Sequence, residues 1–412
     1  MKSNPLKRWP YLALVTLALA SVALGAPPPR TKRISALVIP MDKGAEQSTL
    51  RLEEYMNAAL GEYQGFELKT SDDLFGVATD EDAAASLKRA EQGFAESKAS
   101  FDSRNYEDAE RKLRATIKEY GKAVAAMKSC GSLCDAVAMY AASLQARGEA
   151  EEAKIAILDL LALGPSHELD RKRYPQNFLS LKAQVATGRN AQLRGNFTVK
   201  SKPAGARVYL NGEFQGYTPF TLQTLPVGKH LVRVERPGFR QFGAMIEVTP
   251  EDQELNHELI ATSGYQAYDG LMDRLAGEAM KDKGGSTMSS VATSLKLDRA
   301  IVGVVRELEA GGQSELILGY FDLKTGKRLA VKKATFQGDE YGQLKGEVGR
   351  MVTHLINTGD SGGGEKVSRS GDPLDGHHGT EDWSGEDKGG KNTKKKKSAN
   401  DPLDGVSGTE DW

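Results

Sequence analysis

The sequence lacks the residue patterns that most catalytic and nucleic-acid-binding sites require. Its six histidines are scattered, and it contains no His-x-x-x-His pair with a third ligand, no Gly-x-Ser-x-Gly and no Gly-x-x-x-x-Gly-Lys-Ser/Thr segment. The formal net charge of -1 provides no overall field that would recruit nucleic acid. We therefore expect a non-enzymatic protein with no cofactor, no metal site and no nucleic-acid partner.

Cysteine is almost absent, with only Cys130 and Cys134 in the chain. In an oxidising compartment such an isolated close pair is more typical of a small structural disulfide than of a metal site, because zinc would need two further ligands and no histidine lies nearby in the sequence. The spacing Cys-x-x-x-Cys is one residue longer than the thioredoxin-type motif. We expect a disulfide. The alternatives are two free thiols, or metal or redox chemistry.

The most prominent apolar run extends from Tyr11 to Leu24 and follows a segment with three basic residues. This layout is typical of a secretory signal peptide, and the small residues around Gly25 predict residues 1–25 as the signal and a mature start at Ala26. An uncleaved anchor is the alternative, although the run is shorter than the roughly 20 residues that span a bilayer. We expect a periplasmic or secreted protein with no transmembrane span after cleavage.

Two segments at opposite ends of the chain each predict part of a sheet. Residues 33–78 contain an apolar strand over 34–41, an amphipathic helix and a short strand over 66–70. Residues 265–358 contain helices over 265–283 and 287–297, strands over 299–307, 315–322 and 328–335, and a last helix over 339–357. Because each set alone would leave an apolar face and an edge exposed, we expect residues 34–70 and 299–335 to share one sheet.

Residues 81–190 are predicted to be helical and contain two similar stretches. Each has a helix, a turn with Asn or Gly, and a second helix that opens on Glu-x-Ala, with the alanines at Ala109 and Ala153. This pattern resembles tetratricopeptide repeats, whose alanine allows close helix contact. We expect two degenerate repeats with the excess residues in a loop over 130–134; an unrelated helical bundle is the alternative. Either arrangement offers a face for a partner rather than a reactive site.

Residues 196–260 alternate short β-type runs with turn dipeptides. An Asn211-Gly212 turn between such runs is a strong hairpin signal. The order Ser201-x-Pro203-x-Gly205-Ala206-x-Val208, Asn211-Gly212, Gly216-x-Thr218-Pro219, Leu225-Pro226-x-Gly228-x-His230 and Gly238-Phe239 resembles the PEGA domain family, whose naming tetrapeptide is here Pro203-Ala204-Gly205-Ala206. The resemblance implies a small β-sandwich that serves exported and surface proteins as a binding or spacing unit, without a known active site.

The two terminal segments also resemble a known arrangement. The phrase Leu297-Asp298-Arg299-Ala300-Ile301-Val302-Gly303, followed by Leu316-Ile317-Leu318-x-x-Phe321-Asp322-x-x-Thr325-Gly326, is similar to the closing half of the small α/β domain in TolB amino-terminal regions and curli-secretion lipoproteins. The resemblance implies one discontinuous α/β domain with the helical segment and the PEGA module inserted between its halves.

Residues 361–412 have no apolar periodicity and predict a disordered tail. Within it Asp-Pro-Leu-Asp-Gly-x-x-Gly-Thr-Glu-Asp-Trp occurs twice, over 372–383 and 401–412, with ten of twelve positions identical. An exposed Trp is costly unless a partner's pocket receives it. The candidate partner-binding residues are Leu374, Trp383, Leu403 and Trp412. The alternative is a duplication without use.

The expected fold class is multidomain α+β: a discontinuous small α/β domain with an inserted helical-repeat segment and an inserted β-sandwich module, followed by the disordered tail. The expected function is an exported bacterial envelope scaffold that binds other envelope proteins through the helical repeats and the acidic Trp tail. The alternatives are a protein that binds peptidoglycan or polysaccharide through the PEGA module, or a subunit of an envelope secretion or motility assembly.

Overall fold

A computed structural model describes residues 31–188, 193–281, 283–308, 313–337 and 343–360 of the chain. The predicted signal peptide, with its mature start at Ala26, lies outside these ranges. So does the predicted tail with Leu374, Trp383, Leu403 and Trp412.

A five-stranded mixed sheet joins the two ends of the described chain, in the order β12-β11-β10-β1-β2. Its strands are β1 (Lys32–Pro40), β2 (Phe66–Leu68), β10 (Arg299–Glu307), β11 (Ser314–Asp322) and β12 (Lys327–Phe336). Strand β1 pairs in parallel with β10, from Ile34 opposite Arg299 to Pro40 opposite Val305. The shared sheet that the sequence predicts is therefore present. The apolar runs of β1 and β10 are buried along nearly their whole length, as expected for central strands covered on both faces.

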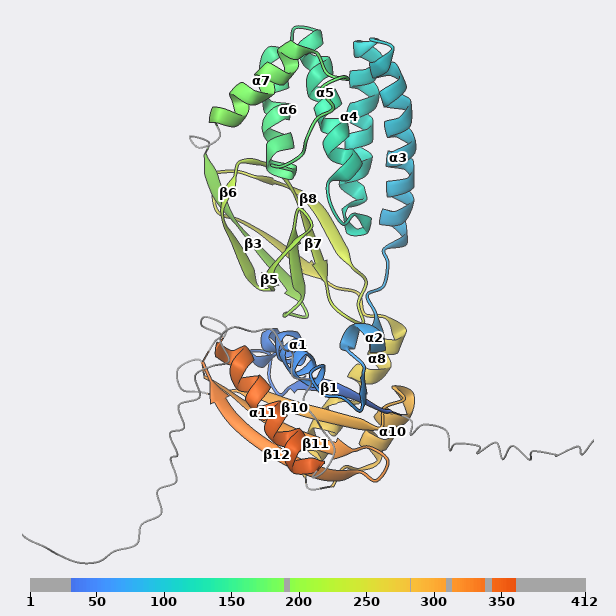
Figure 1. Ribbon diagram of the computed structural model, residues 1–412, viewed down its shortest axis with the longest axis vertical. Coiled ribbons are helices and arrows are strands. Elements are labelled where there is room, and N and C mark those ends of the chain that lie inside the picture. Colours follow the sequence, from blue (N-terminus) through green and yellow to red (C-terminus); the bar gives the residue numbers. More distant parts are fainter. Residues whose placement is uncertain (1–30, 189–192, 282, 309–312, 338–342, 361–412) are drawn as a thin grey trace, which may run out of the picture. The chain divides into compact units, whose positions relative to one another are not determined.

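Helices cover both faces of this sheet (Figure 1). Helices α1 (Thr49–Leu60) and α11 (Gln343–Gly359) pack on one face, where Leu52, Met56 and Val352 are fully buried. The other face packs against α8 (Ser263–Asp269), α9 (Met272–Ala279) and α10 (Ser286–Ser294). The single helix expected over 265–283 is wrong: α8 ends before Gly270, a residue of low helix propensity, and α9 starts two residues later.

The helical segment contains α3 (Glu81–Asp102), α4 (Tyr106–Lys122), α5 (Gly131–Ala146), α6 (Ala150–Leu163) and α7 (Gln176–Thr187). Asp80 and Asn105 cap α3 and α4 with their side-chain oxygens. Ala109 and Ala153 are fully buried, which lets neighbouring helices approach closely. The loop expected over 130–134 is wrong, because α5 begins directly after Cys130 and Cys134 lies in its first turn. The extra residues instead form the 3-10 turn η2 (Val124–Ala126) and its flanks.

Residues 194–258 form two antiparallel-rich sheets that share one apolar core, here called the β-module. One sheet has the order β6-β3-β9 and the other β5-β4-β7-β8. The strands are β3 (Arg194–Lys202), β4 (Arg207–Leu210), β5 (Glu213–Tyr217), β6 (Phe220–Pro226), β7 (Gly228–Glu235), β8 (Phe242–Val248) and β9 (Gln253–Glu258). The predicted hairpin at Asn211-Gly212 is confirmed: both residues have positive φ, 51° and 98°, as a two-residue turn between twisted strands requires.

Candidate functional site

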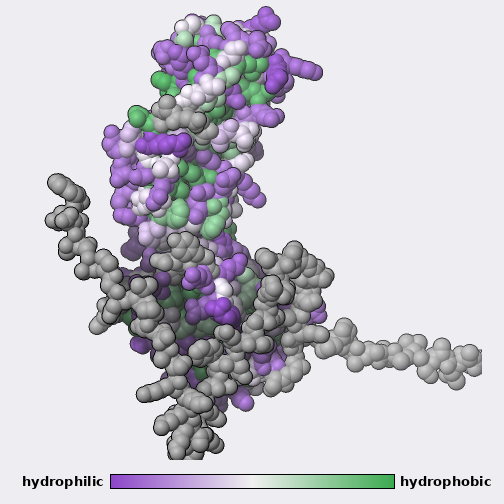
Figure 2. Space-filling view, turned by 60° about the vertical axis from the view of Figure 1, so that its left-hand side comes forward, coloured by the Kyte–Doolittle hydropathy of each residue, from purple (hydrophilic) through white to green (hydrophobic). Residues whose placement is uncertain are grey.

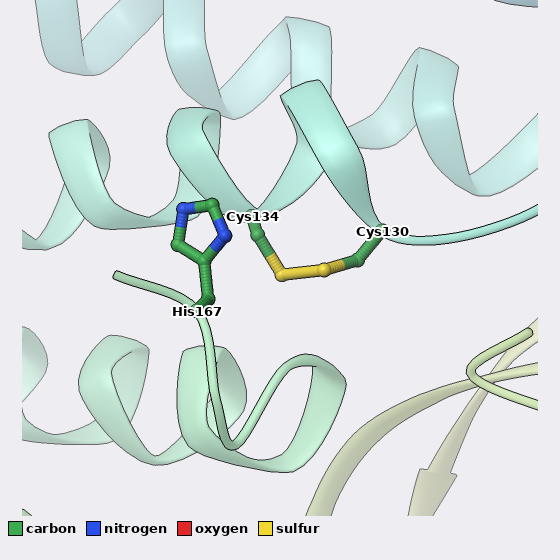
Figure 3. Close-up of side chains that lie close together, drawn as sticks. All are labelled: Cys130, Cys134 and His167. Carbon is green, nitrogen blue, oxygen red and sulfur yellow. A yellow bond between two sulfur atoms is a disulfide. The ribbon is translucent and has the colours of Figure 1, made fainter. Parts of the chain in front are cut away.

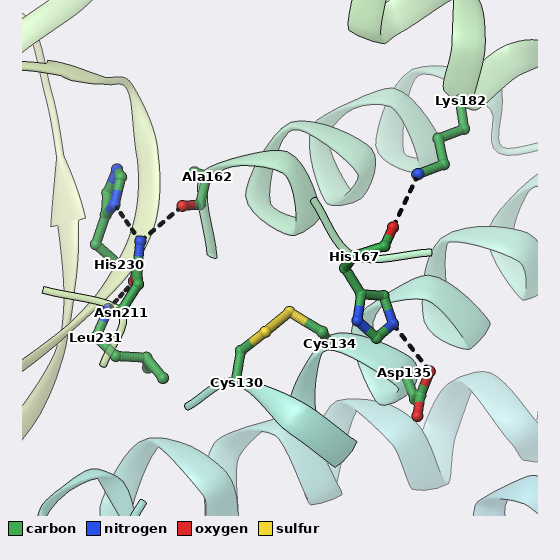
Figure 4. Close-up of a disulfide and its surroundings, with 9 residues drawn as sticks. All are labelled: Cys130, Cys134, Asp135, Ala162, His167, Lys182, Asn211, His230 and Leu231. Atoms are coloured by element: carbon green, nitrogen blue, oxygen red, sulfur yellow. Dashed lines mark hydrogen bonds and ion pairs between the residues drawn. A yellow bond between two sulfur atoms is a disulfide. The ribbon is translucent and has the colours of Figure 1, made fainter. Parts of the chain in front are cut away.

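The β-module is held on one side by the helical segment through Asn211. The side-chain amide of Asn211 donates to the carbonyl of Ala162 at the end of α6, at 2.9 Å, and its oxygen accepts from the backbone N–H of Leu231, at 2.8 Å (Figure 4). Its nitrogen also lies 3.2 Å from Nδ1 of His230. One turn residue thus ties the hairpin to both β7 and α6.

Close backbone approach reinforces this helical junction. Lys229 bonds Asp159 of α6 through both its backbone N–H (3.1 Å) and its ammonium group (2.7 Å). A Cβ atom added to Gly243 would lie 2.2 Å from the backbone nitrogen of Ala125, and one added to Gly212 would lie 2.3 Å from the carbonyl oxygen of Lys128. The glycines therefore let the module contact the helical segment backbone to backbone.

A charged network joins the β-module to the α/β sheet on another side. The guanidinium of Arg207 donates to Glu54 of α1 at 2.6 Å and to both carboxylate oxygens of Asp72. The hydroxyl of Tyr217 also donates to Glu54, and Arg51 lies over the Tyr217 ring. Because the Arg207 side chain is mostly buried while its acidic partners are partly exposed, the network is a specific contact rather than a surface ion pair.

The apolar interior continues across the same junction. Leu37 and Ile39 of β1 share one core with Val199, Val208 and other inward side chains of the β-module. Backbone hydrogen bonds also connect the two parts. The N–H of Ala78 donates to the carbonyl of Phe239, and the N–H of Gln241 donates to the carbonyl of Ala78. The β-module is therefore packed into its neighbours rather than tethered to them.

A small cavity of about 80 Å³, lined by both polar and apolar side chains, lies within this junction. Glu53 of α1 reaches it, accepting from the backbone N–H of Val38 at 2.9 Å and from the hydroxyl of Ser71 at 2.5 Å. Burial raises the pKa of its enclosed carboxyl to about 7, against the opposing effect of these hydrogen bonds and of Arg236. Among the described residues, the buried hydroxyl of Tyr268, which also lines the cavity, has no hydrogen-bond partner.

The two cysteines form a disulfide at the amino-terminal end of α5. The imidazole of His167, from the segment between α6 and α7, lies beside it (Figure 3). A ligand atom of each of Cys130, Cys134 and His167 lies within 4.8 Å of the others. Nε2 of His167 is 3.0 Å from a carboxylate oxygen of Asp135, so the ring orientation is fixed by a second side chain (Figure 4).

Gly164 makes room for this cluster. A Cβ atom at this position would lie 2.8 Å from Sγ of Cys134 and 2.9 Å from Sγ of Cys130. The segment that carries His167 can therefore cross directly over the sulfur atoms, and the ammonium group of Lys182 on α7 holds the His167 carbonyl at 3.2 Å.

The sequence did not indicate several of these residues. His167 follows Cys134 by more than thirty positions, and no metal-type spacing links them. Nothing in the sequence distinguishes four charged residues from the solvent-exposed charges of amphipathic helices and turns: Glu53, Glu54, Asp72 and Arg207. Only Asn211 and Gly212 carried a local signal, since they form a recognisable two-residue turn. The remaining groups become neighbours only through the fold.

On the face that Figure 2 shows, the coloured surface is largely hydrophilic, with hydrophobic side chains in separate patches. One exposed aromatic residue is Phe214 of β5, which is 49% exposed and contacts Tyr209 and Tyr217 edge to face. Within the described ranges, no helix combines the length and the apolar character needed to cross a membrane.

Comparison with known proteins places the β-module in a family. No curated protein matches the chain. Residues 194–262 match the PEGA domain family, over the range that forms β3 to β9 and the short segment that leads into α8. PEGA domains are generally associated with exported or envelope proteins. The chain therefore contains a PEGA domain, fixed between a helical segment and a mixed α/β sheet.

Proposed function

We propose that this chain is an exported, non-enzymatic scaffold of the bacterial envelope. The observation that carries the proposal is the PEGA domain at residues 194–262, packed by hydrogen bonds and ion pairs against both of its neighbours. A spacer must keep its two ends in a fixed relation, and the contacts of Asn211 and Arg207 supply that rigidity. The signal peptide over residues 1–25 delivers the chain to the periplasm or the outside of the cell.

In this proposal the helical segment offers a docking face in the manner of degenerate tetratricopeptide repeats. The buried Ala109 and Ala153, each in the first turn of the second helix of a pair, support this interpretation. The terminal strands form a small domain of the type found in TolB amino-terminal regions and curli-secretion lipoproteins. The two Trp-terminated repeats of the tail bind a further envelope protein, with Leu374, Trp383, Leu403 and Trp412 as apolar anchors.

The test uses the full-length protein as bait in an envelope extract. The wild-type chain should retain a defined set of envelope proteins. Trp383→Ala and Trp412→Ala should each weaken retention, and the double variant should weaken it far more than either, because two linked motifs gain avidity. Asp387→Ala, a tail change outside both repeats, is the control. Equal retention by the wild type and the double variant would rule out the Trp anchors.

A second candidate, binding of peptidoglycan or polysaccharide through the PEGA domain, is favoured by Phe214. An exposed aromatic ring beside Tyr209 and Tyr217 offers the flat apolar surface on which a sugar ring can stack. Co-sedimentation of the full chain with purified sacculi, lost in Phe214→Ala and kept in the double Trp variant, would support this function over the scaffold. A role in a secretion or motility assembly would instead appear as retention of its subunits in the extract experiment.

A further inference from the structure

Cys130, Cys134 and His167 are residue types that bind metals, and Asp135 contacts the histidine. In the structure the two cysteine sulfurs are joined in a disulfide. Cys134 is fully buried and Cys130 partly buried, and the two residues lie at the amino-terminal end of α5. The positive end of a helix dipole stabilises thiolates over thiols. Once reduced, both sulfurs would thus favour the ionised form that binds metals.

The third donor is already oriented. Because Nε2 of His167 lies 3.0 Å from Oδ1 of Asp135, that nitrogen carries the hydrogen of the neutral ring and donates it to the carboxylate. The other nitrogen, Nδ1, then has its lone pair free and is turned to the sulfurs (Figures 3 and 4). A carboxylate behind a histidine is the arrangement that fixes the tautomer of metal-bound imidazoles.

We propose that reduction of the Cys130–Cys134 disulfide creates a site for one Zn²⁺ ion, bound by the two thiolates and Nδ1 of His167. A dithiol reduces the disulfide by thiol–disulfide exchange: two sulfur–hydrogen bonds form on the cysteines, and the dithiol closes to its own disulfide. Zn²⁺ then displaces the two thiol protons, which pass to solvent. Two sulfurs and one imidazole nitrogen match the ligand preference of zinc and leave its fourth position to water.

The surroundings suit a bound ion with one open position. The side chain of His167 is 20% exposed, and that of Asp135 is 48% exposed, so solvent reaches the histidine side of the cluster. On the opposite side the sulfurs contact the backbone of Gly164, where a side chain would intrude on them. Oxidation and metal binding are mutually exclusive, so the site would report the redox state of its compartment.

The experiment measures metal uptake by the full-length protein in two redox states. One sample is reduced with dithiothreitol and freed of it anaerobically, and the other stays oxidised. Each sample is titrated with Co²⁺, and a charge-transfer absorption band from thiolate to Co²⁺ shows that sulfur binds the metal. Zn²⁺ is then added to compete for the same site. The reduced protein should bind one equivalent with this absorption and release protons, while the oxidised protein should show no thiolate absorption. The oxidised sample contains every histidine of the chain, so it corrects for metal bound elsewhere.

Variants separate the proposed ligands from the rest of the chain. His167→Ala should weaken Co²⁺ binding by the reduced protein at least tenfold, and Asp135→Asn by about 10- to 100-fold. His354→Ala, which changes an exposed histidine on α11, should leave binding unchanged. Circular dichroism of the reduced protein should stay that of the oxidised protein. Thiolate absorption that persists with undiminished affinity in His167→Ala, equal uptake by both redox states, or unfolding on reduction would each overturn the proposal.

Discussion

Arg207 and Asp72 are joined by two hydrogen bonds, with Nη1 and Nη2 of the guanidinium 2.9 and 2.6 Å from the two carboxylate oxygens. Asp72 belongs to α2 (Ser71–Phe75), directly after the strand–helix–strand unit of the sheet, whereas Arg207 opens β4 of the PEGA domain. The planar guanidinium fits a carboxylate in this way and a lysine ammonium does not. The pair is therefore one of the specific contacts that attach the PEGA domain to the α/β domain.

Replacing Arg207 by Ala should lower the free energy of unfolding by about 2–3 kcal/mol, because Glu54 and Asp72 lose their shared donor. Arg207→Lys should recover only part of this loss. Lys200→Ala removes an exposed ion pair with Glu254 in the same domain and should change stability by less than about 0.5 kcal/mol. Urea unfolding measures all three, and equal effects of the Arg207 and Lys200 changes would contradict the proposed role of Arg207.

Gly243→Ala should destabilise the protein by about 1–3 kcal/mol, since the new methyl group would meet the Ala125 backbone rather than a movable side chain. Gly277→Ala provides the matched control, because no heavy atom lies within 4 Å of its added Cβ and the residue is in helix α9. That control should be neutral or stabilising by up to about 1 kcal/mol. The midpoint of thermal unfolding is measured for both variants. An unchanged midpoint for Gly243→Ala would disprove the close contact.

Ionisation of Glu53 should lower the free energy of unfolding as the pH rises from about 4.5 to 7. Its pKa is about 7 in the folded chain and near the ordinary value of 4.5 when unfolded. The folded state therefore holds the proton more tightly, so the contribution is fully present below pH 4.5 and is lost as the pH rises through 7. The loss should be about 3 kcal/mol. Glu53→Gln keeps the shape without the ionisation, so its stability should fall less across this range.

The measurement is a series of urea unfolding curves of wild type and Glu53→Gln between pH 4.5 and 8. Glu67→Gln serves as the control, because hydrogen bonds with Lys69 and Arg33 lower the pKa of that exposed carboxyl instead of raising it. Parallel pH profiles for wild type and Glu53→Gln would show that the Glu53 carboxyl is not protonated in the folded protein.

Removal of the disulfide should have a modest effect on stability. Cys130 and Cys134 are only four positions apart, so the crosslink removes little entropy from the unfolded chain, and the Cys130→Ser/Cys134→Ser variant should lose no more than about 2 kcal/mol. Unfolding of the oxidised wild type and the variant gives the difference. A loss above about 4 kcal/mol would mean that the disulfide supports the segment of His167 by more than chain entropy.

Much of the secondary structure follows from local patterns. The strands over 299–307, 315–322 and 328–335 agree closely with β10, β11 and β12, because alternating or continuous apolar runs between Gly and Asp turns are strong local signals. The Asn211-Gly212 hairpin is equally local, since a two-residue turn requires residues that accept positive φ. Helix ends were less predictable: Gly270 divides one expected helix, and Cys130 begins a helix where a loop was expected.

The sequence by itself therefore determined the local elements and the PEGA domain. It also determined that the two terminal sets of strands must pair with other strands. Each of these depends on residues near one another in the chain, or on apolar faces that must be buried somewhere. Only the tertiary structure decided that Arg207 reaches Asp72, that Glu53 is enclosed beside Arg236, and that His167 faces the disulfide. These groups are polar and widely separated in sequence, so no periodicity marks them. Their chemistry arises from proximity, which packing of the apolar core alone creates.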